Sequence, residues 1–448
     1  MVPVVVAMGG SGLAAQSADN MVLDSHISLP PCSTGDVWGL GNYMLVARRH
    51  EGFAVVDVSD PQNPVMNTIH PPGYPVSLGS YGCGDIKSDG RYIYVSDEAT
   101  GQGAFIYDAQ PDPMNPTLVG SLGFPTSSVH NLWIDGDYLY TATGNEVWDV
   151  SDRTNPVYLT RVTTAFSHDI IVLDDIAYVS LWNSGFGIYD VSNPRLPRQL
   201  ARKSYSRAFT HNMWPTDDRN YLFTTDETTD GHVLVWDISS YEVITQVGSY
   251  QAGPTGGVVH NVQVHGDLLF VTYYKEGLRV LDISDPPNPV EIAHYDTYAP
   301  TANGCFGGPY AGCWGVYPWD RTRIMVSDMD NGAYVLRLTA IDQSFSAASP
   351  TVAPGTTIDL SFSYQNDAAQ PLGAFGVATL SGINGIPLVF SLLADARVLQ
   401  PGESASFNLP IPVPAGFPLG WPVEFTGYTG IASPLIVSDT QQVTVTVQ

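Results

Sequence analysis

Positive charge is scarce in this chain, and so are long apolar runs and cysteine. Only three of the 448 residues are lysine, and the formal net charge is −26. Such a chain repels phosphate backbones, which excludes a nucleic-acid partner, and it is disfavoured at anionic membranes. No run of about 18 apolar residues is present, so no transmembrane segment is expected. The four cysteines form no CxxC pair, which excludes a zinc ribbon.

The cysteines predict disulfides instead, provided that the chain is exported. Cys305 and Cys313 flank a short glycine-rich loop that is flexible enough to let them pair. Cys32 and Cys83 each precede the first strand of adjacent repeats, and we predict a second bridge between them. Four buried thiols are the alternative. Export is expected because the apolar stretch 2–8, followed by small residues up to 18, resembles the end of a secretory signal.

A short motif recurs along most of the chain, in which an apolar strand ends in Asp-Val-Ser or Asp-Ile-Ser before a turn. Copies lie at 52–61, 147–152, 187–194, 233–239 and 276–290, with a weaker copy at 104–108. A unit that recurs every roughly 40 to 55 residues is typical of a propeller or solenoid. The sixth unit predicts four strands, at 258–264, 268–274, 278–282 and 290–295, which tight turns join into one antiparallel blade.

The repeats predict an all-β chain with a seven-bladed β-propeller over residues 20–340. The seventh unit has no obvious fourth strand, so we expect residues 20–30 to supply it and to close the ring. Residues 1–19 form the signal-like N-terminus. Residues 341–448 lack the repeat and contain stretches such as 354–364 that alternate polar and apolar residues, which predicts an immunoglobulin-like β-sandwich.

Chemistry-bearing residues recur at one position of the repeat. Four histidines open the first strand of four successive units, and each is followed by Asn or Asp: His130, His168, His211 and His260. The first strand of a blade is the innermost one, so these imidazoles are expected near the axis. They are candidate ligands for copper, zinc or iron. The alternative is that each pair only hydrogen-bonds one blade to the next.

The turns between the second and third strands are expected on the same face, and they carry acids. Carboxylates there are candidate ligands for a cation, including calcium, and an indole is a candidate stacking surface for a sugar or peptide. No GxGxxG, P-loop, HExxH or GxSxG motif stands in its usual context, so no catalytic residue is predicted. The ligand-binding candidates are Asp97, Glu98, Asp226, Glu227, Glu276, Asp328 and Trp314.

The blocks Val-Val-Asp-Val-Ser-Asp-Pro at 55–61 and Val-Leu-Asp-Ile-Ser-Asp-Pro at 280–286 resemble the LVIVD repeat, a β-propeller unit of exported proteins. The blocks 209–218, 225–227, 259–262 and 312–318 resemble choice-of-anchor B proteins over about residues 20–340. That resemblance implies a secreted or surface protein, although no sorting motif stands at the C-terminal end. More distantly, 167–170 with 178–182 resembles one blade of the selenium-binding protein and methanethiol oxidase family, which has metal-binding histidines.

Three functions remain open from the sequence. The leading hypothesis is an exported, extracellular or cell-surface protein that binds a protein, carbohydrate or ion on the axial face of the propeller. The second is a metal-dependent, oxidase-like enzyme that uses the same histidines. The third is a self-assembling filament or surface-layer subunit, in which the C-terminal domain makes head-to-tail contacts.

Overall fold

The computed structural model describes residues 17–77, 82–126, 128–253, 257–298, 308–339, 341–366, 372–400, 402–432 and 435–448. Every regular element in these ranges is a β-strand, which confirms the prediction of an all-β chain. The described residues include no helix that is long and apolar enough to cross a membrane. The chain divides into two compact units, Leu23–Leu336 and Asp19–Val22 with Arg337–Gln448. Residues 1–16 of the predicted signal-like segment lie outside the described residues.

The repeats form a series of antiparallel sheets. Six contain four strands and one contains five. Their strands, sheet by sheet, are β3(Thr34–Leu40), β4(Tyr43–Arg48), β5(Gly52–Asp57), β6(Val65–Ile69); β7(Ile86–Ser88), β8(Tyr92–Ser96), β9(Ala104–Asp108), β10(Thr117–Ser121); β11(Leu132–Asp135), β12(Tyr138–Thr141), β13(Glu146–Asp149), β14(Val157–Arg161); β15(Asp169–Leu173), β16(Ile176–Ser180), β17(Phe186–Asp190), β18(Arg198–Lys203); β19(Thr210–Pro215), β20(Tyr221–Asp226), β21(Val233–Asp237), β22(Thr245–Tyr250); β23(Val259–His265), β24(Leu268–Tyr273), β25(Gly277–Asp282), β26(Val290–Tyr295); and β27(Cys313–Pro318), β28(Arg323–Asp328), β29(Gly332–Leu338).

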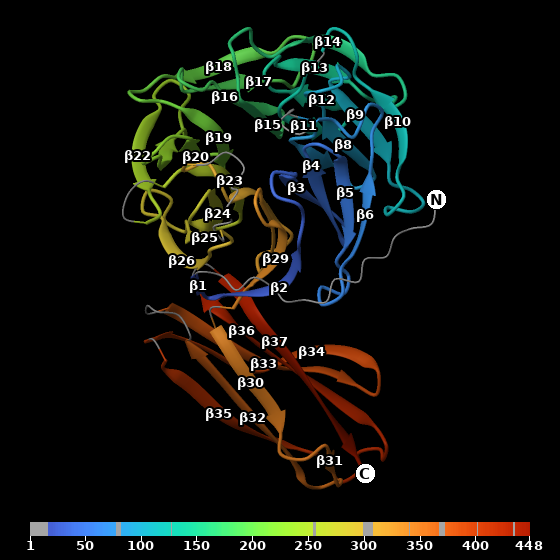
Figure 1. The fold of residues 1–448 in the computed structure, drawn as a ribbon. Helices are drawn as coiled ribbons and strands as arrows, with labels where there is room; N and C mark the ends of the chain where they lie inside the picture. The colour runs from blue at the N-terminus through green and yellow to red at the C-terminus, as the bar shows by residue number, and fades with distance from the viewer. Residues whose placement is uncertain are drawn as a thin grey trace. The chain divides into compact units, whose positions relative to one another are not determined.

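These sheets stand around a common centre, with strands such as β3, β11, β15 and β19 innermost and β6, β10, β14, β18 and β22 at the rim (Figure 1). Burial follows the same gradient, because second strands such as β4 and β24 are almost wholly buried while fourth strands such as β22 are largely exposed. Two N-terminal strands extend the last two sheets: β1(Ala18–Asp19) lies beside β26, and β2(Met21–Ile27) lies beside β29.

The recurrent Asp-x-Ser motif forms a turn that leads from the third strand to the fourth. In each intact copy the aspartate Oδ1 accepts a hydrogen bond from the backbone N–H of the serine two residues later. The donor–acceptor distance is 2.9 Å for Asp57, 3.0 Å for Asp190 and 2.8 Å for Asp282. A side chain that hydrogen-bonds its own backbone in this way fixes the start of a turn, which explains why the motif marks the same point in each sheet.

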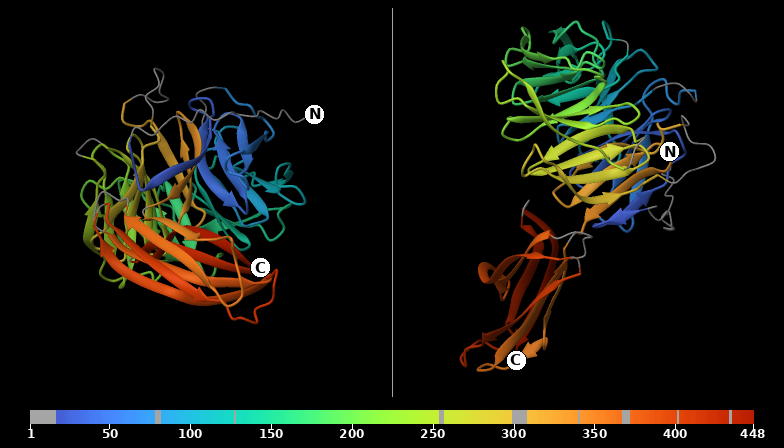
Figure 2. Two further views of the ribbon diagram at one scale, coloured as in Figure 1. Left: turned by 90° about the horizontal axis from the view of Figure 1, so that it is seen from below. Right: turned by 90° about the vertical axis from the view of Figure 1, so that its left-hand side faces the viewer.

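The C-terminal unit contains two sheets that pack face to face (Figure 2). Residues on β32 alternate between exposed and buried, as the polar–apolar alternation predicts. A Cβ on Gly376 of β33 would lie 2.7 Å or less from the rings of Phe362 and Tyr364, so the two layers meet closely there. The strands are β30(Ile341–Ala347), β32(Thr357–Asn366) and β35(Ser404–Pro412) in one sheet and β31(Thr351–Val352), β37(Leu435–Val447), β36(Pro422–Ala432), β33(Leu372–Ile383) and β34(Ile386–Leu399) in the other.

Both predicted disulfides are wrong. Cys83 and Cys313 are free buried thiols, so neither the bridge between Cys32 and Cys83 nor that between Cys305 and Cys313 forms. Cys32 is disulfide-bonded, and Cys305 lies outside the described residues. The physical reason is that Cys313 is the first residue of β27 and is fully enclosed, so its thiol is not available to the loop that precedes it.

Candidate functional site

A pocket at the centre of the sheet ring is lined by pairs of consecutive residues that lie in, or just before, several first strands. In a regular strand, neighbouring side chains point to opposite faces, so only one of the two would face the centre. Register shifts interrupt this alternation in four first strands, between Thr34 and Val37 in β3, and at the equivalent points of β19, β23 and β27. A β-bulge adds one residue and re-aims the local side chains. The His-Asn pairs stand at these points in β19 and β23.

A hydroxyl on the second strand stabilises the bulges of β19, β23 and β27. The Thr272 Oγ1 accepts a hydrogen bond from the backbone N–H of Asn261 at 3.0 Å and donates to the carbonyl of Trp314 in the next sheet at 2.7 Å. Thr225 makes the equivalent contacts to Asn212 and to the His260 carbonyl. These bonds replace ladder bonds that the bulge removes, and they join neighbouring sheets.

The second residue of several pairs connects one sheet to the next. Asp85 Oδ2 accepts from the Leu132 N–H at 2.8 Å, and Asn212 Oδ1 accepts from the Val262 N–H at 2.9 Å. Asn131 Oδ1 accepts in the same way from Ile170 at 3.3 Å. Asp85, Asn131 and Asn212 therefore fit the alternative interpretation, in which these residues hydrogen-bond one sheet to the next.

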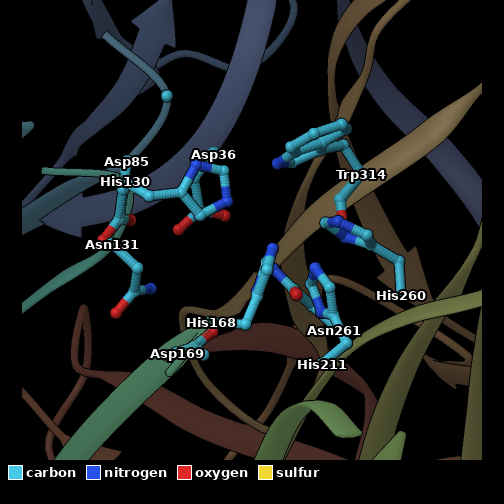
Figure 3. Close-up of a pocket in the computed structure, with 11 residues that line it drawn as sticks. Asp36, Asp85, His130, Asn131, His168, Asp169, His211, His260, Asn261 and Trp314 are labelled. Carbon is cyan, nitrogen blue, oxygen red and sulfur yellow. The ribbon is translucent and has the colours of Figure 1, made fainter. Parts of the chain in front are cut away.

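The first residue of each pair has a different environment. The four predicted histidines form a continuous arc, with ring centroids 4.5 Å apart for His130 and His168, 4.1 Å for His168 and His211, and 4.2 Å for His211 and His260. The Trp314 ring continues the arc 4.4 Å from His260. All five side chains line one pocket (Figure 3). The structure thus brings the four predicted histidines together at this pocket.

Several imidazole nitrogens in this arc lack a partner. His260 Nδ1 lies 2.8 Å from the Trp314 carbonyl, but its Nε2 is buried and has no hydrogen-bond partner among the described residues. The same holds, within those residues, for Nδ1 of His168 and of His211. Unpaired buried polar atoms are costly, so they indicate a ligand, an ion or ordered water in the pocket.

A second layer of side chains surrounds the arc, and it comes from the ends of the second strands. The Trp182 indole stacks on His168 with centroids 4.4 Å apart, and Glu98 Oε1 lies 2.9 Å from His130 Nδ1. Glu227 Oε2 lies 3.9 Å from His211 Nε2. Of the predicted acids, Glu98 and Glu227 therefore reach the histidines.

Electrostatics keeps most of the arc neutral. Burial is the main cause that lowers the pKa of His168 and of His211 well below the ordinary value, and neighbouring histidines lower it further. Burial also lowers the pKa of His260 to about 3. These three imidazoles are neutral at neutral pH, which is the form that binds metals.

The two glutamates differ in their effects. Burial alone would lower the pKa of His130, but the hydrogen bond and charge of Glu98 outweigh it and raise that pKa. Burial raises the pKa of Glu227 to about 7, although the Tyr274 hydroxyl donates to its Oε1 at 2.6 Å and opposes the shift. Glu227 is therefore a carboxyl group that a nearby cation can ionise at neutral pH.

One subset of these groups has the composition of a metal site. His168, His211 and Glu227 each offer one ligand atom, and the three atoms lie within 4.8 Å of one another. Two imidazoles and one carboxylate suit zinc, iron or copper, and they leave coordination positions open toward the pocket. His130 and His260 flank this trio in the arc.

None of the predicted acids is among the residues that line the described pocket, and the remaining four make their contacts within the surrounding turns. Asp226 accepts hydrogen bonds from the Tyr205 hydroxyl at 2.7 Å and the Phe209 N–H at 2.8 Å. Asp328 accepts from the Thr297 hydroxyl and from backbone groups of its own turn. Burial raises the pKa of Glu276, and its backbone carbonyl accepts from an arginine three residues later. The carboxylates of Asp226 and Asp328 therefore organise the turns around the pocket.

Asp97 has the most extensive structural role among them. Its carboxylate accepts hydrogen bonds from the Tyr74 hydroxyl at 2.9 Å, the Thr100 hydroxyl at 2.6 Å and the Gln102 N–H at 2.9 Å. We expect Asp97→Ala to lower the free energy of unfolding by about 3 kcal/mol, because several half-buried donors lose their one buried acceptor. Urea denaturation measures this loss. Asp152→Ala, which removes a cap from an exposed turn, is the control and should have a smaller effect; equal effects would contradict the assignment.

The comparisons with known proteins agree on the fold. The LVIVD repeat family matches residues 31–70, 127–164, 167–199 and 256–297. The crystal structure of the RRP9 WD40 repeats is 12% identical, with a TM-score of 0.51, over 73% of this chain and 99% of that chain. The Cps50 (Swd1) β-propeller domain of Myceliophteria thermophila is 11% identical, with a TM-score of 0.52, over 71% and 99%. No curated protein sequence matches the chain. The chain thus contains LVIVD repeats in a propeller fold.

Proposed function

We propose that this protein binds a transition-metal ion in the axial pocket, through His168, His211 and Glu227. The observation that carries this proposal is the convergence of their three ligand atoms to within 4.8 Å at the centre of the ring. The burial of His168 and His211 supports it, since it keeps both imidazoles in the neutral form that binds metals. Zinc, copper and iron are the candidates that two imidazoles and one carboxylate favour.

The surroundings support a binding role for the occupied site. Tyr274 holds one oxygen of Glu227 and leaves the other directed at His211, so the carboxylate is oriented before an ion arrives. Outer-sphere contacts of this kind strengthen metal binding. The aromatic rings of Trp182 and Trp314 flank the arc, and they offer apolar surface to a protein or carbohydrate ligand that coordinates the ion.

A metal-dependent enzyme is the second candidate. Three protein ligands leave open positions for water or substrate, which is the arrangement that catalytic metal sites use. In that case the metal would supply Lewis-acid or redox chemistry at its open positions, and Glu227 would be one of the three residues that hold it. Turnover of a substrate by the metal-loaded protein separates this candidate from a binding protein.

The proposal also covers the finer details of the fold and the location of the protein. We take the seven sheets of residues 18–338 as a seven-bladed propeller, closed by residues 20–30, and residues 341–448 as an immunoglobulin-like sandwich. From the sequence blocks that resemble choice-of-anchor B proteins, we also propose that this protein is exported and associated with the cell surface. A self-assembling role is favoured by one observation: β34, at the edge of its sheet, exposes Ile386 and Phe390 by about 60%.

Elemental analysis of untagged protein after exhaustive dialysis tests the metal site. We expect about one equivalent of zinc, copper or iron per chain in the wild type, and a loss of most of it in Glu227→Gln. This substitution retains the shape of the side chain but removes the charge that a cation requires. Glu98→Gln is the matched control, because Glu98 contacts only His130 of the arc, and it should retain the metal. A metal-free wild type that also takes up none of these ions on addition would refute the proposal.

A further inference from the structure

Below the imidazole arc, a buried cluster contains more negative than positive charge. The side chains of Asp36, Asp85, Asp169 and Lys87 belong to residues that are at most 8% exposed. The Lys87 ammonium forms ion pairs with Asp36, at 2.8 Å, and with Asp85. One ammonium balances one carboxylate charge, so this group of three carboxylates has a deficit of positive charge when it is ionised.

Asp169 is the carboxylate that Lys87 does not contact. Its Oδ2 accepts a hydrogen bond from Asn212 Nδ2 at 2.8 Å. Its Oδ1 is buried and has no hydrogen-bond partner among the described residues, and the same is true of Asn261 Oδ1. Both residues line the axial pocket (Figure 3). Asp169 is 5% exposed, so its free oxygen faces the cavity rather than bulk solvent.

Two cavities meet at this level of the axis. The upper one lies against the imidazoles, and the lower one lies against the indoles of Trp38, Trp133 and Trp214. Four residues line both cavities: Asp36, Asn131, Asp169 and Asn261. The acceptor atoms of these four side chains are all oxygens, whereas the arc above them supplies nitrogens. Oxygen ligands select hard cations and imidazoles select transition metals.

We propose that Asp169 and Asn261 hold a calcium ion on the axis, in a second site that is separate from the transition-metal site. Calcium accepts carboxylate and amide oxygens together with waters, and it tolerates irregular geometry. Its charge would balance the carboxylate that Lys87 leaves uncompensated. Because the protein supplies few ligands, the affinity is expected in the range of about 10⁻⁴ to 10⁻³ M that extracellular calcium modules show.

Differential scanning calorimetry of the chelator-treated full-length chain tests this site. We expect calcium chloride to raise the Tm, with saturation in the millimolar range, and magnesium chloride at equal ionic strength to have a much smaller effect. Asp169→Asn retains an acceptor for Asn212 but loses the charge, so its Tm should no longer respond to calcium. His211→Ala, which removes only a nitrogen ligand, should respond like the wild type. The calcium site and the transition-metal site are therefore tested separately, and a negative result for one does not contradict the other.

Two results would overturn the calcium site: a wild-type Tm that does not change with calcium, or an equal rise with magnesium, which would reflect ionic screening. A second variant decides the matter if Asp169→Asn does not fold. Asn261→Asp adds a carboxylate at the other unpartnered oxygen, and it should strengthen calcium binding about tenfold by isothermal titration calorimetry. Unchanged or weaker calcium binding in that variant would equally contradict the site.

Discussion

We expect His211→Ala to lower the affinity for zinc by at least about a hundredfold, because His211 is the central ligand of the proposed trio. Loss of an outer contact to a metal ligand already lowers affinity by about 10- to 100-fold, and loss of a ligand itself should cost at least as much. The imidazole of His211 is 4% exposed, and Glu227 lies 3.9 Å from its Nε2, so no neighbouring side chain of the trio replaces it without rearrangement. Competition with a chromophoric chelator at neutral pH measures the affinity.

His130→Ala is the matched control for this experiment. His130 belongs to the same arc and contacts His168, but its Nδ1 is held by Glu98 and it is not part of the trio. Its substitution should change the zinc affinity less than about tenfold. Equal losses in both variants would show that the arc acts as a whole. No loss in either variant would mean that the zinc site lies elsewhere.

Much of the fold follows from local chemistry that the sequence displays. The Asp-x-Ser turns are repeated because each aspartate hydrogen-bonds its own backbone, and a pattern of this kind is visible without any tertiary information. Every end of the four strands of the sixth unit lies within one residue of the predicted end. Tight turns on both sides leave little freedom for the strands between them.

The direction of the histidines did not follow from the sequence, because strand alternation alone allows two answers. The bulges that settle it depend on hydroxyls in the partner strand, such as Thr272, which bond the re-aimed backbone. A signal for them was present, since Ser or Thr recurs two residues before Glu98 and before Glu227 and at the same position in other units. Recognising it required knowledge of the register between strands.

Arg49 was also not predicted as a site residue from the sequence, although it lies at the same repeat position as Glu98 and Glu227. Its guanidinium lies 5.5 Å from the centroid of the Trp314 ring and donates to Met329 Sδ at 3.8 Å. A basic residue at the position that two other units fill with glutamate was visible as an exception in the repeat. The disulfide predictions were wrong for another reason. Pairing depends on which cysteines the strands bury, and this cannot be deduced from the spacing of cysteines along the chain.

The second large effect expected is an opposite pH dependence of stability at two buried groups. Burial lowers the pKa of His260 to about 3 and raises that of Asp328 to about 7. His260 therefore contributes stability that is present above its unfolded pKa of about 6.5 and is lost as the pH falls toward 3. Asp328 contributes stability that is present below its unfolded pKa of about 3.9 and is lost as the pH rises through 7.

Two near-isosteric variants isolate these contributions from other titrating groups. In His260→Asn the amide can still donate to the Trp314 carbonyl, and in Asp328→Asn the amide retains the shape of the protonated acid. Relative to His260→Asn, the wild type should lose about 1.4 kcal/mol of unfolding free energy for each pH unit below 6.5. Relative to Asp328→Asn, it should gain about as much for each unit below 7.

Urea denaturation of chelator-treated protein, from neutral pH down to about pH 4.5, measures both differences. Metal must be removed because coordination would hold the neighbouring imidazoles neutral at every pH and mask the effect. The sign of each slope is the decisive result, since it depends only on whether burial disfavours a cation or an anion. Slopes of the same sign in the two comparisons, or flat differences, would show that water reaches these side chains and that burial does not set their pKa values.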